Sequence, residues 1–214
     1  MKKIIITGGL GYIGTELCKL YSGVSWNNKI IVIDNRFISE RVNQLRNWNI
    51  DFIQGDILDK ELIKKYCKDA DVIHHLAGIT DVPRTKSDAD LVKDNKIKLV
   101  AQEGTKNILD VISDNCKIIF PSTHVIYEGI DEVKNNLNEE DEIKPVLAYS
   151  QSKANNETQL KKSGKNYVIL RLGSVYGYST DTARTDIMPN FFSMMASQDK
   201  NIKLFAGGRQ LKSL

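Results

Sequence analysis

Tyr149 and Lys153 lie four residues apart in the stretch AYSQSK (148–153). Residues with this spacing share one face of an α-helix. A free phenol loses its proton near pH ~10 and a free lysine near pH ~10.4, so neither does proton chemistry readily at neutral pH. A nearby ammonium favours the phenolate, and Tyr149 would then serve as a general base or acid. Without further support, the pair is typical of a solvated helix face.

A second pair of groups lies upstream in PSTHVIYE (121–128), where Ser122 and Thr123 follow a run rich in isoleucine. Either hydroxyl could hydrogen-bond a substrate oxygen and share the proton that is moved. From the residues alone, the candidate catalytic group is therefore Tyr149 and Lys153 together with the hydroxyl of Ser122 or Thr123.

The glycine-rich stretch TGGLGYIG (7–14) places Gly8, Gly11 and Gly14 at intervals of three, after an apolar run and before a helical pattern. Glycines permit a tight turn and a close backbone approach to a pyrophosphate, while the helix N-terminus supplies N–H donors and partial positive charge. A purely structural turn is the alternative, but the strand and helix around it favour a dinucleotide site.

Asp34 ends the next apolar run, twenty residues beyond Gly14. A carboxylate there accepts hydrogen bonds from the adenosine ribose and repels a 2′-phosphate. The spacing therefore favours NAD over NADP, although Arg36, two residues further on, weakens that preference.

Two more predicted strand ends fit the same ligand. In Gly55-Asp56-Ile57, Asp56 would lie near the adenine amino group and Ile57 against the ring. In His75-Leu76-Ala77-Gly78, small residues would let the cofactor pass. Each could be an ordinary turn, but together they would fall at successive carboxyl ends of one sheet.

Continuous hydrophobic runs predict strands that are buried on both faces, which is typical of a parallel sheet covered by helices. With helical spacing at Ile13–Leu20 and Leu99–Ile112, the pattern predicts a doubly wound α/β fold. The predicted strands are Lys2–Thr7, Lys29–Asp34, Asp51–Asp56, Asp71–Ala77, Lys117–Ser122 and Tyr167–Leu172.

The pattern changes after Gly177. We expect a loop (Tyr178–Ile187), a helix (Pro189–Ser197) and a short strand (Ile202–Phe205). The chain is therefore divided into a nucleotide-binding domain, 1–177, and the start of a second lobe, 178–214. Because GGRQLKSL ends abruptly at Leu214, we expect that this lobe is incomplete.

Composition excludes several classes of function. The 214 residues carry 30 basic and 27 acidic side chains, a net charge of +3 that is too small to indicate a nucleic-acid partner. No apolar run reaches the ~20 residues of a membrane helix. Three widely spaced cysteines indicate reduced thiols and a cytoplasmic location. The three histidines lack metal-ligand spacing, so no metal site is predicted.

These motifs resemble those of extended short-chain dehydrogenases/reductases of the NAD-dependent epimerase/dehydratase family. Beyond the stretches above, the resemblance extends to Asp34-Asn35, Gly104-Thr105, PVLAYSQSK (145–153) and RLGSVYG (171–177). It implies a Rossmann-type domain that binds NAD and a smaller lobe that binds a nucleotide-activated sugar. Family members often form homodimers through the helix that carries the Tyr/Lys pair.

By position, the resemblance makes Tyr149 the acid/base, Thr123 the hydroxyl that orients the substrate, and Lys153 the residue that holds the nicotinamide ribose and lowers the tyrosine pKa. The substrate contacts would be Thr80, Thr123, Tyr149 and Ser174. The cofactor contacts would be Gly8, Gly11, Tyr12, Ile13, Gly14, Asp34, Asn35, Asp56, Ile57, Leu76, Ala77, Gly78, Tyr149 and Lys153.

Several positions depart from the family pattern. Dehydratases carry an acidic pair after the threonine, where this chain has His124 and Val125, so sugar dehydration is disfavoured. His124 is expected to be a loop residue. Further departures, which indicate a divergent branch, are Ala101 and Ser174 in place of asparagines, Glu128 in place of a glycine, and Pro121 late in a strand.

The sequence thus predicts an NAD-dependent nucleotide-sugar epimerase in which Tyr149 removes a hydroxyl proton while hydride passes to the nicotinamide. A net reductase or dehydrogenase with the same three residues is the alternative. A non-catalytic NAD-binding protein is the rival from another class.

Overall fold

The computed structural model describes residues 1–24, 27–80, 90–179 and 184–209. Six parallel strands form one sheet in the order β3-β2-β1-β4-β5-β6. All six lie where the sequence predicts them, within one or two residues at each end. They are β1 (Lys3–Thr7), β2 (Lys29–Asp34), β3 (Asp51–Gln54), β4 (Val72–His75), β5 (Lys117–Thr123) and β6 (Asn166–Leu172).

Helices connect the strands and follow the last of them. The helical patterns expected from the sequence correspond to α1, α4, α5 and α6. The described helices are α1 (Tyr12–Ser22), α2 (Ser39–Asn47), α3 (Lys60–Cys67), α4 (Leu91–Leu109), α5 (Ala148–Lys162) and α6 (Met188–Ser197), with short 3-10 turns η2 (His124–Tyr127) and η3 (Phe205–Gly208). None of the described helices is long and apolar enough to cross a membrane.

Both faces of the sheet are buried, which explains the unbroken apolar runs. Ile4 and Ile6 of β1 pack with α1 and α2 on one face, whereas Ile5 packs on the other with α3, α4 and α5. The same alternation continues in β2, where Ile31 and Ile33 join Ile5. Because side chains alternate along a strand, a segment buried on both sides must be apolar at every position.

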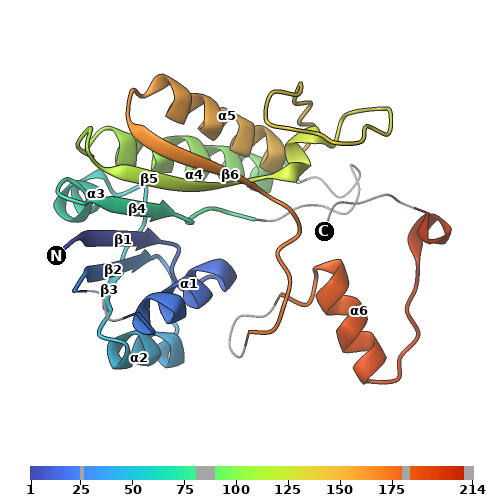
Figure 1. The fold of residues 1–214 in the computed structure, drawn as a ribbon, viewed down its shortest axis with the longest axis horizontal. Helices are drawn as coiled ribbons and strands as arrows, with labels where there is room; N and C mark the ends of the chain where they lie inside the picture. Colours follow the sequence, from blue (N-terminus) through green and yellow to red (C-terminus); the bar gives the residue numbers. More distant parts are fainter. Residues whose placement is uncertain (25–26, 81–89, 180–183, 210–214) are drawn as a thin grey trace.

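The strand order sets the position of the functional edge. The chain leaves β3, at one edge, and crosses to β4 on the other side of β1, so the connections diverge between β1 and β4. Ligands of doubly wound folds bind beyond the carboxyl ends of the strands at this switch point. In Figure 1 the strands point toward the side on which α6 lies. The doubly wound prediction is confirmed, while the division at residue 177 stays a prediction.

The predicted strand at Ile202–Phe205 is wrong. Residues 201–204 have no regular structure, and η3 begins at Phe205. A strand needs a neighbour for its backbone hydrogen bonds, and neither edge strand of the described sheet, β3 or β6, pairs with this segment.

Pro121 is accommodated without a bulge. The pairing of β5 with β4 ends at Ile119, whereas its pairing with β6 continues to Thr123. The proline thus lies beyond the part of β5 that has hydrogen-bonded neighbours on both sides.

The packing of β5 leads to a prediction about the free energy of unfolding. Ile118 is fully buried at 0% exposure. Ile118→Ala should reduce the free energy of unfolding by about 2–5 kcal/mol, because it leaves a cavity against α3, α4 and α5. Urea denaturation measures the change. Leu20→Ala is the control, because Leu20 is 69% exposed on α1 and should change stability by no more than ~0.5 kcal/mol. Equal effects of the two substitutions would contradict this packing.

Candidate active site

A cleft of about 1880 Å³ runs along the carboxyl edge of the sheet. Every residue that the sequence predicts for the site lines this one cleft, from the glycine loop at one end to Thr80 and Ser174 at the other. The structure therefore brings the predicted residues together, while their individual roles stay predictions.

The glycine loop fits closely against its neighbours. Gly8 adopts φ +71°, and a Cβ there would lie 2.7 Å from the Ala77 nitrogen at the end of β4. A Cβ on Gly14 would lie 2.5 Å from the Gly8 carbonyl oxygen. Only glycine permits this approach of the β1 turn to α1, which leaves backbone N–H groups at the helix start open toward the cleft. The loop therefore fits the diphosphate of a dinucleotide.

Two carboxylates at the adenosine end are held in place by the backbone. The oxygens of Asp34 accept hydrogen bonds from Leu10 N and Arg36 N, both at 3.0 Å. Asp56 accepts one from Leu58 N at 2.9 Å and one from the Asn35 amide at 3.2 Å. These bonds fix both carboxylates before any ligand binds.

The charge of Arg36 lies beside Asp34. The guanidinium Nε is 3.4 Å from Asp34 Oδ1, and the arginine side chain is 55% exposed. The preference for NAD over NADP therefore stays a prediction at this position.

Thr123 and Tyr149 meet where β5 and α5 converge. Thr123 is the last residue of β5, and Tyr149 is the second residue of α5. Both side chains line the cleft, and the Thr123 hydroxyl is among the groups that act to lower the pKa of Tyr149. The Lys153 ammonium, one turn further along α5, donates to the Pro121 carbonyl at 2.7 Å and lies 4.5 Å from the centre of the Phe120 ring.

The electrostatics of Tyr149 depend on its burial and on its neighbours. Burial raises the pKa of Tyr149 above its ordinary value, while the Thr123 hydroxyl and the positive charge of Arg184 act to lower it. The Lys153 ammonium donates to the Pro121 carbonyl and lies 5.9 Å from the Tyr149 ring centre, and its effect on the tyrosine pKa stays a prediction. Burial also lowers the pKa of Lys153, to about 8.

A buried polar chain lies beneath this pair. His75 Nδ1 is 2.9 Å from Thr7 Oγ1, and its Nε2 is 3.0 Å from Thr105 Oγ1, which also accepts from the Asn156 amide. Burial, followed by the charge of Lys153, lowers the pKa of His75 to about 3. A neutral His75 thus ties β1, β4, α4 and α5 together.

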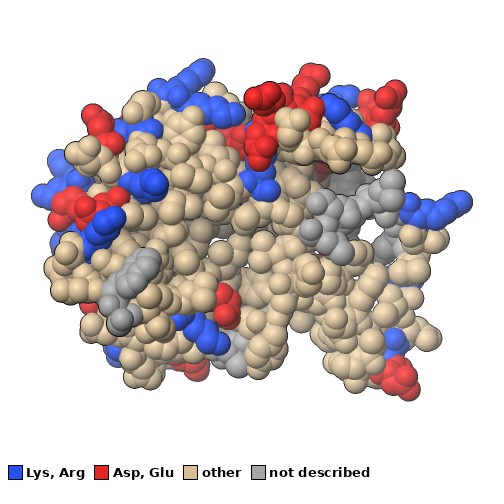
Figure 2. All heavy atoms as spheres, in the orientation of Figure 1, with Lys and Arg blue, Asp and Glu red and all other residues tan. Residues whose placement is uncertain are grey.

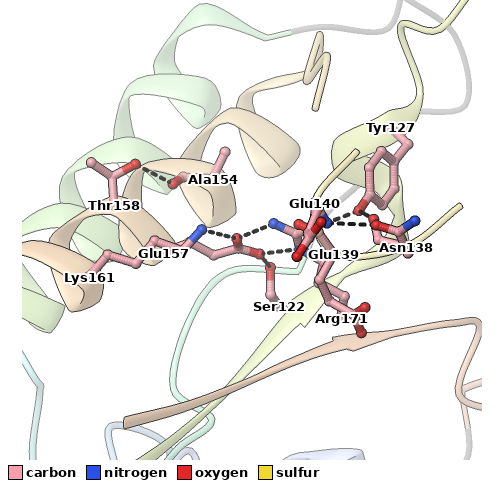
Figure 3. A network of polar contacts seen from close by, with 10 residues as sticks. All are labelled: Ser122, Tyr127, Asn138, Glu139, Glu140, Ala154, Glu157, Thr158, Lys161 and Arg171. Atoms are coloured by element: carbon pink, nitrogen blue, oxygen red, sulfur yellow. Dashed lines mark hydrogen bonds and ion pairs between the residues drawn. The ribbon is translucent and has the colours of Figure 1, made fainter. Parts of the chain in front are cut away.

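Ser122 does not serve the site as its sequence position suggested. Its hydroxyl donates to Glu157 Oε1 at 2.6 Å, and Arg171 binds the same carboxylate through Nη2 at 2.7 Å (Figure 3). Burial raises the pKa of Glu157, but the hydrogen bonds from Arg171 and Ser122 outweigh this effect, so the pKa lies below its ordinary value. Sequence reasoning missed this link between α5, β5 and β6.

Sequence reasoning also missed Arg184. Its guanidinium binds Asp186, with Nε 3.0 Å from Oδ1, and its Nη1 lies 3.5 Å from Thr80 Oγ1. Both Arg184 and Asp186 line the cleft beside Tyr149. The only sequence signal is the charged pair RTD in a segment without periodicity. Residues 180–183 of the predicted loop lie outside the described residues.

Two positions that depart from the family pattern contact neighbouring elements. His124 is the first residue of η2, and its Nδ1 lies 3.1 Å from the Leu172 carbonyl oxygen. The backbone carbonyl of Ala101 accepts from the Asn156 amide at 3.0 Å, a bond that does not depend on the side chain at this position.

The three cysteines are buried and unpaired. Across the described residues, no cluster of three histidine, cysteine or acidic side chains is suited to a metal ion.

Comparison with known proteins identifies the family of this chain. The model of the NAD dependent epimerase/dehydratase family matches residues 4–214. The chain belongs to this family. The predicted family is thus confirmed, and it is a family of NAD-dependent enzymes.

Curated relatives include epimerases and dehydratases. The chain is 28% identical to a dTDP-D-glucose 4,6-dehydratase of Dictyostelium discoideum, over 94% of this chain and 49% of that protein. It is 33% identical to a CDP-paratose 2-epimerase of Salmonella typhi, over 63% of this chain and 40% of that protein. The chain thus spans at most about half the length of these two relatives.

Solved structures agree. A UDP-glucuronic acid 4-epimerase from Bacillus cereus, in complex with UDP-glucuronic acid and NAD, superposes with a TM-score of 0.77 at 25% identity, covering 97% of this chain and 67% of that one. A UDP-glucose 4-epimerase from Thermotoga maritima with UDP-glucose gives 0.78 at 23% identity, covering 96% and 66%, which shows the shared fold.

The close packing of the glycine loop leads to a prediction about NAD binding. Gly14→Ala should weaken NAD binding at least ~10-fold, because the new Cβ would push Gly8 and Gly9 away from the start of α1. Gly23→Ala is the control, since its Cβ would lie 3.7 Å from the nearest atom, an ordinary contact. Calorimetric titration with NAD measures both variants. Unchanged affinity in Gly14→Ala would show that the loop does not hold the cofactor.

The lowered pKa of Lys153 predicts how the stability of the protein depends on pH. Below pH 8 Lys153 is charged in the folded protein, and the burial of this charge reduces the free energy of unfolding. Between about 8 and 10.5 the unfolded chain binds more protons than the folded one, so this group makes unfolding free energy rise with pH. The stability of wild type relative to Lys153→Met should therefore increase from pH 7 to pH 10.

Urea unfolding at several pH values measures this difference. Lys162→Met is the matched control for the loss of one positive charge, because Lys162 is exposed on the same helix. A difference between wild type and Lys153→Met that stayed constant with pH would contradict the prediction.

Proposed function

We propose that the protein is an NAD-dependent epimerase of a nucleotide sugar. The observation that carries this proposal is the position of Thr123 and Tyr149 at the carboxyl edge of the sheet, in one cleft with a glycine loop shaped for a dinucleotide. A hydroxyl and a phenol in this position suit proton removal from a secondary alcohol next to a nicotinamide.

In the proposed reaction, Thr123 orients the sugar hydroxyl and Tyr149 removes its proton. NAD, when bound, would supply the oxidising chemistry by accepting a hydride and returning it. The keto sugar then turns in the cleft and Tyr149 gives the proton back, so the configuration is inverted. The positive charge of Arg184 favours the phenolate form of Tyr149. Lys153 and Asp34 are proposed to hold the two riboses of the cofactor.

Dehydration is less well supported, although the relatives include dehydratases. Elimination of water needs a general acid next to Thr123. At these positions His124 is engaged with the Leu172 carbonyl, and Val125 has no acidic group. The epimerase relatives, including the NAD-bound enzyme from Bacillus cereus, support an epimerase.

Net reduction or oxidation with the same residues is the alternative, and an NAD-binding protein without chemistry is the rival. An epimerase gives no net NADH, whereas a reductase consumes it stoichiometrically. A panel of UDP-, CDP- and dTDP-sugars, followed by product analysis and by absorbance of NADH, distinguishes the three. The homodimer and the cytoplasmic location remain predictions.

The decisive variant is Tyr149→Phe. It should lower turnover by at least ~10²-fold, because the general acid/base is removed, while NAD affinity stays within about twofold. Tyr167→Phe is the matched control, because Tyr167 lies at the amino end of β6, where it pairs with Ile118 rather than with the Thr123 end of β5. Wild-type turnover in Tyr149→Phe would refute the mechanism.

A further inference from the structure

The helix that carries Tyr149 lacks a cap of its own. Its N-cap residue, Leu147, has no side chain that can accept a hydrogen bond, and the first turn contains no acidic residue. The first N–H groups of a helix have no partner within the helix. Because Tyr149 is the second residue of α5, loosening of this end would displace its hydroxyl directly.

Glu128, in a distant part of the chain, supplies one cap contact, to the N–H of the N-cap residue Leu147. Glu128 Oε1 accepts hydrogen bonds from Val146 N at 2.9 Å and from Leu147 N at 2.7 Å, and it also binds the Ser150 hydroxyl. These partners lie on both sides of Tyr149 in the sequence. A carboxylate at this position also interacts favourably with the positive end of the helix dipole.

Glu128 is tied to Thr123 through a single short turn. Thr123 caps the start of η2, where its Oγ1 accepts from Val125 N at 3.2 Å. Glu128 closes the other end of η2, where its N–H donates to the Val125 carbonyl at 3.1 Å. One rigid turn therefore bears the substrate-orienting hydroxyl at one end and the cap of the Tyr149 helix at the other.

Two backbone hydrogen bonds close the loop that follows Glu128, and we call this closure the neck. Gly129 N donates to the Lys144 carbonyl at 2.9 Å, and Lys144 N donates to the Ile126 carbonyl at 2.8 Å. A Cβ on Gly129 would lie 2.5 Å from the Lys144 oxygen, so the two segments of the neck approach as closely as glycine allows. The neck holds Glu128 beside residues 146–150.

We propose that Glu128 is a positioning residue that fixes Tyr149 of α5 relative to Thr123 of β5. This inference rests on the proposed function, in which Tyr149 is the acid/base. Glu128 acts through the backbone of α5 and through Ser150, and it touches neither the substrate nor the cofactor in this role.

Three variants test the proposal. Glu128→Ala removes the cap, and should reduce kcat about 10–100-fold, because displacement by ~1 Å costs on this order. Glu128→Gln keeps an acceptor oxygen and should recover most of that loss. Asp131→Ala is the matched control: it removes an acid from the same loop, where Asp131 pairs with Lys144 and is 88% exposed. Its kcat should stay within about twofold of wild type.

Two measurements separate positioning from a general loss of structure. NAD affinity should stay within about twofold in all three variants, because the glycine loop is untouched. If NAD affinity and kcat fell together in Glu128→Ala, or if Glu128→Gln were as impaired as Glu128→Ala, the proposal would be overturned. Wild-type kcat in Glu128→Ala would overturn it as well.

A readout without turnover keeps this test independent of the proposed function. The ¹³Cζ signal of labelled Tyr149, assigned by its loss in Tyr149→Phe, reports the surroundings of its hydroxyl. It should shift in Glu128→Ala and remain in place in Glu128→Gln and Asp131→Ala. If the wild-type protein turned over no nucleotide sugar, the proposed function would fail, and this signal alone would decide the role of Glu128.

Discussion

The close approach of β1 and β4 at their carboxyl ends is the constraint on which the rest of the structure depends. Gly8 and Ala77 come within a distance that leaves no room for a side chain on Gly8. Ala77 N also donates to the Thr7 hydroxyl at 3.2 Å, and Thr7 is bound to His75. Because this junction lies at the switch point of the sheet, it fixes the glycine loop and also His75, whose ring centre lies 5.8 Å from that of Phe120, the residue under the Lys153 ammonium. The remaining strands add their ends to an edge that is already defined.

The electrostatics of the catalytic pair follow from its burial. Both the phenol and the ammonium lose water, which raises the pKa of Tyr149 and lowers that of Lys153. Each shift disfavours the charged form of its group. In such a buried site, a neighbouring charge such as that of Arg184 has a large effect on the pKa of Tyr149. A neutral His75 beneath the pair avoids a second buried cation.

Sequence predicted the parts of the site that depend on local pattern. The glycine loop, Asp34 and the Tyr149/Lys153 pair follow from spacing within one turn, one strand or one helix, and the strands follow from apolar runs. Local spacing did not decide between Ser122 and Thr123, because neighbouring side chains of a strand point to opposite faces. Ser122 shares the α5 face with Phe120 and binds Glu157 there. Arg184 and the cap on α5 depend on contacts between distant segments, which a spacing rule does not contain.

The neck at Gly129 and Lys144 separates two regions that obey different constraints. Residues on the helix side of the neck must keep their geometry to within a fraction of an ångström. Beyond it, the loop carries exposed acidic side chains, including Asp131, Glu132, Glu139, Glu140 and Glu142. In Figure 2, acidic side chains gather at the upper right. Two contacts tie part of this loop to the domain: the Tyr127 hydroxyl donates to the Asn138 carbonyl at 2.8 Å, and Arg171 Nη1 donates to the Glu139 carbonyl at 3.1 Å. Since loop length changes closure entropy only slowly, the part of the loop outside these contacts can change in length or charge at small cost in evolution. That part is also a suitable place to insert a label.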